Sequence, residues 1–128
     1  MSTHISPKDA DFLREMNKKE TTAIREDTGK VRLDLISPIA TIGTAQVLTY
    51  GASKYPLHNW RKGLQWSRCI GSLMRHLFKF MAGEDFDQET GLPHIDHVAS
   101  NAMFLQEYFR THKELDDRYN TELKENGV

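Results

Sequence analysis

Two histidines and an asparagine, spaced by three and four positions, have the clearest chemical potential in this chain. At about 100° per residue, His94, His97 and Asn101 fall within one narrow sector of a helix. Polar side chains beside a buried face need hydrogen-bond partners or a ligand. The column therefore indicates either a ligand-binding face or a structural network in which the imidazoles bond to nearby carbonyl groups.

A third histidine, His76, lies at the edge of an apolar stripe in the preceding helical segment. An antiparallel arrangement of the two segments would bring it to the column of His94 and His97. A single histidine in such a place is more often a boundary residue than a ligand, so its interpretation depends on these neighbours. An HD-type hydrolase is excluded, because that signature needs His followed by Asp, whereas here Asp96 precedes His97.

Between the two segments, residues 83–91 carry four carboxylates within six positions. Mg²⁺ and Mn²⁺ prefer hard oxygen ligands, commonly one or two carboxylates together with phosphate oxygens and water. A short acidic loop between two helices suits that task, and a solvated acidic connection is the alternative. The glycines stand in the wrong places for an EF-hand calcium loop.

Residues 50–66 mix aromatic and basic side chains in what reads as a loop. Bases there could meet phosphates, and the aromatic rings could stack on a purine. We expect Lys54 and Asn59 to contact a ligand. For Trp60 and Trp66, packing in the core beneath the loop is the favoured role.

Three helices with readable ends must position these residues. Ser37 caps the first, Pro38 stands in its first turn, and Gly51 is expected to end it. The second begins at residue 66 or 67 and stops at Gly83, and Pro93 opens the third.

The second and third helices each carry an apolar stripe with helical spacing, predicted to be buried. The stripes consist of Ile70, Leu73, Met74, Leu77 and Met81, and of Ile95, Val98, Ala102, Leu105 and Phe109. Asp96 points away from the histidine column and is expected in solvent. Residues 31–35 alternate like a short extended segment without a partner strand, so no sheet is predicted.

The fold class predicted is all-α, a small helical bundle completed by oligomerisation. A polar segment (1–29) precedes the helical domain (30–110), and a charged helix or tail (111–128) follows it. The domain offers only about eighty residues of core-forming sequence, and small domains often gain burial by forming homo-oligomers.

Composition limits the classes of partner. The 128 residues are 27% charged and 38% hydrophobic, with a net charge of −1. That balance is globular, and the total charge favours neither a nucleic acid polymer nor an anionic membrane. One cysteine, Cys69, and no long apolar run predict a cytoplasmic protein without disulfides.

Taken together, the motifs resemble the phage dATP/dGTP diphosphohydrolase domain, a group associated with the MazZ and MazG-like all-α nucleoside triphosphate pyrophosphatases. The residues that carry the resemblance span about eighty positions. They are Arg32-Leu-Asp-Leu, Tyr50-Gly-Ala-Ser-Lys-Tyr, Asn59-Trp60, Trp66-Ser67, Arg75-His76-Leu77, Gly83-Glu84 and Asp87-x-Glu89-x-Gly91-Leu-Pro-His94-x-x-His97-x-x-x-Asn101.

The resemblance implies a metal-dependent cut between the α- and β-phosphates of a purine (d)NTP such as dGTP or dATP, which remodels a phage nucleotide pool in the host cytoplasm. One departure is clear. MazG proteins carry Glu-Glu-x-x-Glu and Glu-x-x-Asp on their helices, whereas here those helices carry histidines and the carboxylates lie in the loop.

Roles follow for the individual residues. Glu84 and Asp87 would hold Mg²⁺ or Mn²⁺, with Glu89 as a third ligand or a water-orienting base and His76 beside it as a catalytic group. The substrate-binding residues expected are Lys54, Asn59, Trp60, Arg75, His94, His97 and Asn101. Two alternatives remain: a non-catalytic nucleotide-binding protein, such as a phage sponge for an immune signal, and a structural protein with packed histidines.

Overall fold

All regular elements in residues 5–19 and 22–119, the residues that the computed structural model describes, are helices. In chain order they are α1 (Pro7–Lys19), η1 (Leu33–Leu35), α2 (Pro38–Lys54), η2 (Asn59–Lys62), α3 (Trp66–Met81), α4 (His94–Thr111) and η3 (Lys113–Leu115). The predicted all-α class is confirmed. Within those ranges, none of the helices has the length and apolar character needed to cross a bilayer.

The chain divides into two units, residues 1–35 and 36–128. In the first unit, the Ser6 hydroxyl accepts the Asp9 amide and caps α1. The extended conformation expected near residue 33 is wrong, because Leu33–Leu35 form a turn of 3₁₀ helix. Arg32 pairs with Asp34 across that turn at 2.7 Å, a local contact that needs no neighbouring strand.

The second unit begins with α2, whose start was predicted correctly. Ser37 Oγ accepts the Ala40 amide, and Pro38 occupies the first turn. The predicted end at Gly51 is wrong, since the helix continues to Lys54. A glycine inside a helix costs only about 1 kcal/mol and does not stop it. The helix ends just before Tyr55, which precedes a proline and is therefore extended.

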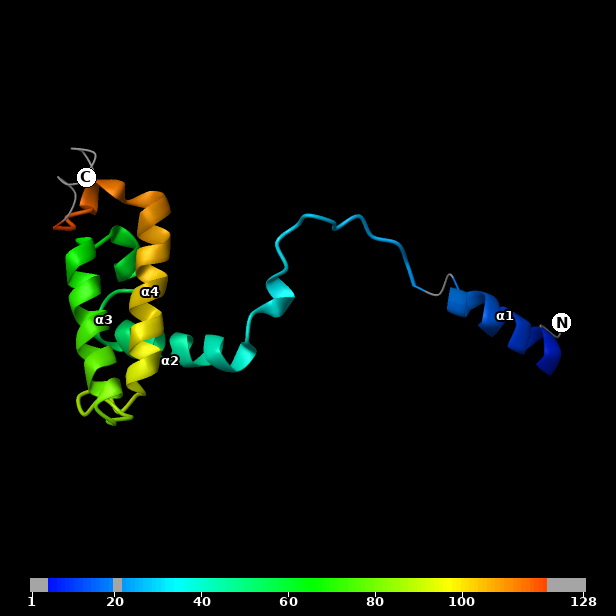
Figure 1. Ribbon diagram of the computed structural model, residues 1–128, viewed down its shortest axis with the longest axis horizontal. Helices are drawn as coiled ribbons and strands as arrows, with labels where there is room; N and C mark the ends of the chain where they lie inside the picture. The colour runs from blue at the N-terminus through cyan, green and yellow to red at the C-terminus, as the bar shows by residue number, and fades with distance from the viewer. Residues whose placement is uncertain (1–4, 20–21, 120–128) are drawn as a thin grey trace. The chain divides into compact units, whose positions relative to one another are not determined.

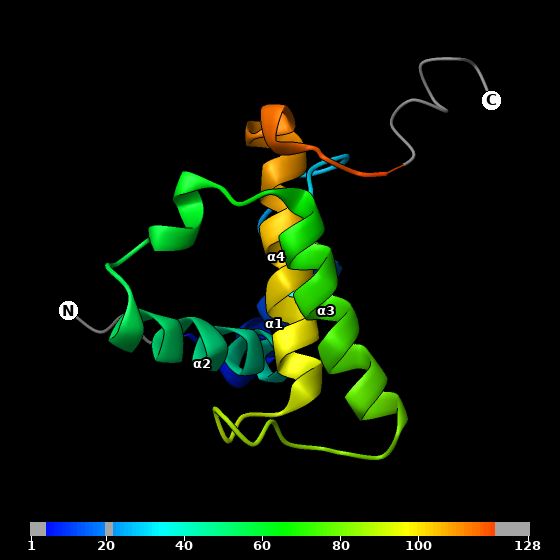
Figure 2. The same cartoon turned by 90° about the vertical axis from the view of Figure 1, so that its left-hand side faces the viewer.

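Helices α3 and α4 lie side by side and antiparallel, and α2 runs across them (Figures 1 and 2). Gly83 has φ +96°, a conformation that suits glycine and lets the chain leave the end of α3. Pro93 precedes the first residue of α4, as predicted. This α3–α4 hairpin fixes which side chains of the two helices can meet.

Helix α2 approaches α4 at Gly43. A Cβ built on this glycine would overlap the Asp96 carboxylate, so a larger residue here would require the Asp96 side chain to move. Asp96, expected in solvent, is half-buried at this crossing. The close approach places the C-terminal half of α2 opposite the polar face of α4.

The apolar core lies at the end of the hairpin where α3 begins. It consists of Trp66, Cys69 and Tyr108. The Trp66 indole donates to the His112 carbonyl at 3.1 Å, and the Tyr108 hydroxyl donates to the Trp60 carbonyl. Burial raises the pKa of Tyr108 to about 12, so its hydroxyl remains a donor. Core packing for Trp66 is confirmed.

The predicted apolar stripes are only partly buried. Ile70, Leu73, Val98, Ala102 and Leu105 are half-buried, and Leu105 packs against the core. The other members are exposed, among them Met81 at 77% and Ile95 at 43%. The most buried residues of α4 are instead His94, His97, Ser100 and Tyr108, because α4 turns this face towards α3 and α2.

Candidate active site

The antiparallel hairpin gathers three histidines at the end far from the apolar core. His76 Nδ1 of α3 lies 2.9 Å from His94 Nδ1 of α4. The ring of His76 also stacks on that of His97, with centroids 4.2 Å apart and planes 6° apart. The predicted approach of His76 to the column is confirmed, and it follows from the pairing of the helices.

The loop between α3 and α4 folds back on itself and delivers carboxylates to these histidines. Phe86 and Pro93 form an isolated β-bridge across it. The Asp87 amide donates to Leu92 O, and Gly91, with φ +72°, donates to Asp87 O. This compact turn seats the Asp87 side chain against the first turn of α4, where it is buried.

Asp87 and His97 are joined through Thr90. Asp87 Oδ2 accepts the Thr90 hydroxyl at 2.9 Å and the Thr90 amide at 3.1 Å. Because its only proton goes to Asp87, Thr90 Oγ1 must accept from His97 Nε2, which lies 2.8 Å away. His97 therefore carries its proton on Nε2, and its Nδ1 is left with a lone pair when the ring is neutral.

Glu84 positions His94, which in turn contacts His76. Its Oε2 lies 2.7 Å from His94 Nε2, and His94 is fully buried. With its Nε2 proton donated to Glu84, a neutral His94 offers a lone pair at Nδ1, to which His76 Nδ1–H donates. In a neutral His76, the nitrogen without a proton is therefore Nε2.

The titration of these groups suits a ligand site. Burial lowers the pKa of His76 and of His97, and neighbouring histidines lower both further. Burial alone would raise the pKa of Asp87, but the hydrogen bonds from Thr90 outweigh it and the pKa is lowered. At neutral pH the imidazoles of His76 and His97 are therefore neutral, and the Asp87 carboxylate beside them is ionised. Neutral imidazole and ionised carboxylate are the protonation states that can bind a cation.

His76, Asp87 and His94 each offer one donor atom, and the three atoms lie within 4.8 Å of one another. The set combines imidazole nitrogen with carboxylate oxygen, which fits a divalent transition metal ion such as Mn²⁺ better than Mg²⁺. The residues present thus fit a metal ion. Glu84, predicted as a ligand, reaches this cluster through its bond to His94.

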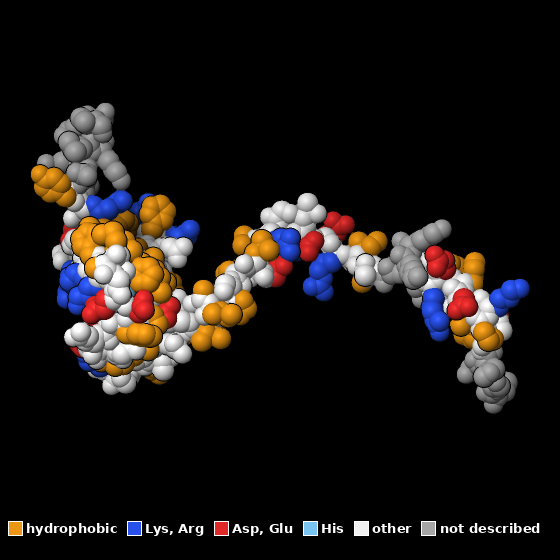
Figure 3. All heavy atoms as spheres, turned by 60° about the horizontal axis from the view of Figure 1, so that its bottom comes forward, with side chains coloured by type: hydrophobic (Ala, Val, Ile, Leu, Met, Phe, Trp, Pro, Cys, Tyr) orange, Lys and Arg blue, Asp and Glu red, His pale blue; other side chains and the backbone are white. Residues whose placement is uncertain are grey.

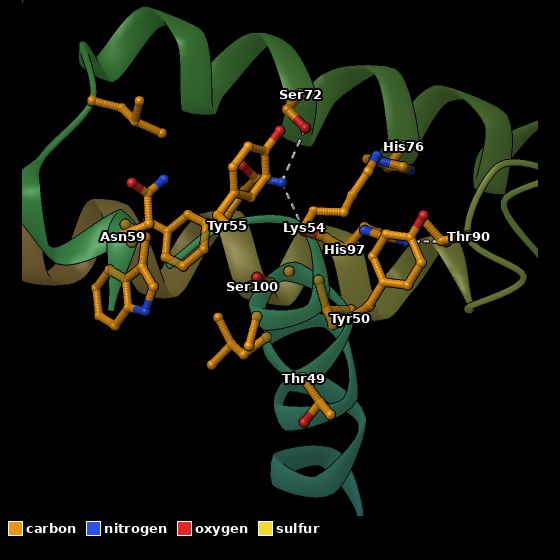
Figure 4. Close-up of a pocket in the computed structure, with 18 of the residues that line it drawn as sticks. Thr49, Tyr50, Lys54, Tyr55, Asn59, Ser72, His76, Thr90, His97 and Ser100 are labelled. Atoms are coloured by element: carbon orange, nitrogen blue, oxygen red, sulfur yellow. Dashed lines mark hydrogen bonds between the residues drawn. The ribbon is translucent and has the colours of Figure 1, made fainter. Parts of the chain in front are cut away.

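A cavity of about 1020 Å³ opens beside the cluster, between α2, α3, α4 and the segment after α2 (Figure 4). Most of the residues predicted for the site line it: Lys54, Asn59, Trp60, Arg75, His76, Asp87, Glu89, His97 and Asn101. Glu84 and His94 do not line it. Glu84 bonds to His94, and His94 contacts His76, which does line it. Trp60 combines both roles weighed for it, since it packs on the core and also forms part of the cavity wall.

Two charged residues meet at the cavity. Lys54 Nζ of α2 lies 3.4 Å from Glu89 Oε1 of the acidic loop. This contact raises the pKa of Lys54, which therefore stays protonated. It also joins the end of α2 to the loop that carries Asp87.

The cavity wall includes residues that sequence reasoning missed, among them Ser72, Thr90 and Ser100. The position of Thr90, three residues after Asp87, is a usable local signal, because an aspartate often accepts an amide and a hydroxyl at that spacing. No local pattern marks Ser72 or Ser100, because the position of each in the cavity depends on how α3 and α4 pair.

Comparison of the sequence with known proteins identifies a family and a relative. The sequence profile of the family described as dATP/dGTP diphosphohydrolase, N-terminal, matches residues 20–118. A protein of Salmonella phage PMBT28 named dATP/dGTP diphosphohydrolase is 39% identical over 97 residues, which cover 76% of this chain and 33% of that protein. The chain thus spans about a third of the length of this relative. No solved structure gives a significant match.

Proposed function

Because the chain belongs to the dATP/dGTP diphosphohydrolase N-terminal family, as its motifs predicted, we propose that it hydrolyses purine deoxynucleoside triphosphates to the monophosphate and pyrophosphate. The observation that carries the proposal is a cluster of metal-binding groups at the side of a cavity large enough for a nucleotide. In this proposal the nucleotide binds within the predicted domain of residues 30–110. The protein would act in the cytoplasm of a phage host.

The metal ion would be held by His76, Asp87 and His94, and Mn²⁺ suits these donors better than Mg²⁺. When bound, it would polarise a phosphate oxygen and lower the pKa of the attacking water. Glu84 orients His94 by accepting its Nε2 proton, which leaves on Nδ1 a lone pair that a metal ion would take in place of the His76 hydrogen bond. Thr90 likewise accepts the Nε2 proton of His97.

The protein's own charges would bind the phosphates. Lys54 and Arg75 line the cavity and can neutralise negative charge on the polyphosphate. On binding, Lys54 exchanges the Glu89 carboxylate for a phosphate oxygen. Glu89, 74% exposed along its side chain, is then free to accept a hydrogen bond from the attacking water and later its proton.

The purine would lie at the other end of the cavity. Trp60 stacks on Phe104 with ring centroids 4.9 Å apart, and Asn59 stands beside it. Arg61 Cζ lies 4.6 Å from the centroid of the Trp60 ring, so a purine would stack on Trp60 by taking the place of this guanidinium. Trp60 and Phe104 form an aromatic wall at the end of the cavity opposite the metal-binding cluster. This order, cluster and then aromatic wall, matches the order of phosphates and base in a nucleotide.

A second copy of the chain would cover the apolar surface. Only three hydrophobic residues, Trp66, Cys69 and Tyr108, are buried in the described residues, a small core for such a domain. Helices α2 and α3 instead expose Ile39 at 85%, Met74 at 43% and Met81 at 77%. Orange side chains crowd the visible face of the second unit in Figure 3. We therefore expect a homo-oligomer, as the sequence predicted.

The oligomer is tested by light scattering at micromolar concentration. The wild type should exceed the 14.8 kDa of one chain, and Met81→Lys should shift the distribution towards the monomer. Leu33→Lys, which changes an exposed apolar residue of the first unit, is the matched control. A monomeric wild type would contradict the proposal.

The activity is tested by measuring release of the monophosphate and pyrophosphate from each (d)NTP. Mn²⁺ and Mg²⁺ should be compared at equal concentration. Purine dNTPs should be cleaved, fastest with Mn²⁺. Tight nucleotide binding that survives EDTA, without turnover under either metal, would instead identify a nucleotide-binding protein and overturn the enzyme.

A further inference from the structure

Between the metal-binding cluster and the aromatic wall, the cavity has a polar section formed by Ser72 of α3 and by Ser100 and Asn101 of α4 (Figure 4). Along α4, Asn101 follows His97 by one turn and precedes Phe104 by about one more. A nucleotide has its sugar in the same place, between phosphates and base. The polar section therefore lies where a bound nucleotide would place its sugar.

The hydrogen bonds of Asn101 determine what it can offer a ligand. Its Nδ2 donates to the His97 carbonyl at 2.9 Å and to Ser72 Oγ at 3.2 Å. Because a carbonyl only accepts, the amide cannot be turned the other way. Both N–H bonds are thus used within the protein, and the atom left for a ligand is the acceptor Oδ1.

The two serines supply the complementary donors. Ser72 Oγ accepts from Asn101, so its own proton remains for an acceptor in the cavity. Ser100 Oγ is the buried side-chain polar atom without a hydrogen-bond partner in the described residues, and Ser100 is 1% exposed. A buried hydroxyl without a partner is unfavourable, which indicates that a bound ligand completes this section.

We propose that Ser72 and Asn101 hold the 3′-hydroxyl of the nucleotide sugar, with Asn101 Oδ1 accepting its proton and the Ser72 hydroxyl donating to its oxygen. The Ser100 hydroxyl is a further donor for an oxygen of the sugar. This assignment rests on the proposed nucleotide site and adds a specificity that the cluster and the aromatic wall do not provide. It gives the substrate-binding role predicted for Asn101 a specific partner, the sugar.

The test compares dGTP with 2′,3′-dideoxy-GTP, which lacks only the 3′-hydroxyl. The ratio of their kcat/KM values is measured with Mn²⁺, and the Kd values of dGMP and dideoxy-GMP are measured by calorimetry, where no turnover intervenes. Two neutral hydrogen bonds of about 1 kcal/mol each should favour the 3′-hydroxyl by about thirtyfold, or about fivefold if only one forms. Ser72→Ala and Asn101→Ala should each reduce that ratio towards one.

Thr49→Val is the matched control, because Thr49 lines the same cavity but donates its hydroxyl to the Ala45 carbonyl at 2.8 Å. It should leave the ratio unchanged. Equal use of both nucleotides by the wild type, or a ratio that survives Ser72→Ala, would overturn the assignment alone. A changed preference between dATP and dGTP with an unchanged 3′-hydroxyl ratio would also overturn it, in favour of a base contact. If no nucleotide binds or is cleaved, the proposed function itself fails.

Discussion

Replacing Asp87 by Asn tests whether the metal-binding group is the one found in the structure. Asp87 is a direct donor of the cluster, whereas Glu84 acts through His94 Nε2. Asp87→Asn keeps the size of the side chain and an oxygen that can accept from Thr90, but it removes the negative charge. Glu84→Gln keeps an oxygen for the His94 proton and removes a charge one step further from the ion.

The positions of the two carboxylates set different magnitudes. Removing a direct electrostatic contact to reacting groups typically costs ~10²–10³-fold in rate. Removing the hydrogen-bond partner of a ligand typically costs ~10–100-fold in metal affinity or activity. Asp87→Asn should therefore lose about tenfold more activity than Glu84→Gln. Nucleotide binding should suffer less, since Lys54 and Arg75 remain.

The assay is pyrophosphate release at saturating dGTP, combined with calorimetric titration of Mn²⁺ into each variant. Thermal unfolding of both variants should resemble that of the wild type, which separates loss of the site from loss of the fold. If Glu84→Gln abolishes Mn²⁺ binding while Asp87→Asn retains it, Glu84 is the direct ligand and the cluster is wrongly assigned.

Three further perturbations test contacts elsewhere in the fold and within the cavity. Asp117 accepts the Ser67 hydroxyl and amide at the start of α3, and these bonds lower the pKa of Asp117. Its contribution to stability is therefore complete above the pKa of the unfolded chain and is lost as pH falls through the lower folded value. Denaturation of wild type and Asp117→Asn should differ at pH 6 and converge below about pH 4, whereas a constant difference would contradict the contact. Gly43→Ala would push the Asp96 carboxylate aside but favours the helix by about 1 kcal/mol, so the net change in stability should stay within about 1 kcal/mol. Urea denaturation measures this, and Gly43→Ala should be clearly stabilising in an Asp96→Ala background, where the overlap is gone. Ser100→Ala should be neutral or slightly stabilising without nucleotide, because it removes an unpaired buried hydroxyl. A loss above ~1 kcal/mol in urea would show that the hydroxyl is already bonded.

Local signals determined much of what the sequence could predict. Ser37 and Pro38 start α2, Gly83 follows the end of α3, and Pro93 precedes α4, as expected. Each signal acts within about one turn of its own residue, so a single sequence reveals it. The helical period likewise placed His94 and His97 on one face before any contact was known.

The family was also accessible from the sequence, because the motifs of the acidic loop and α4 are local patterns. The fold class follows for the same reason, since the helices are specified by their own caps and periods. Most of the site residues predicted from these motifs, Lys54 and Asn101 among them, line one cavity. Their roles in catalysis and binding stay predictions.

Burial and pairing were decided only by the tertiary structure. Apolar spacing marked Leu77 and Met81 as interior, yet α4 presents its polar column to α3 and leaves them exposed. A stripe states which residues share a face, but the neighbouring helix decides which face is covered. The same holds for the carboxylates. From their spacing in the loop, Glu84 and Asp87 were both predicted as metal ligands. The fold of residues 83–93 instead places Glu84 at His94, and Asp87 at Thr90 and the cluster. Spacing could not distinguish them, because hydrogen bonds across a turn depend on its closed geometry.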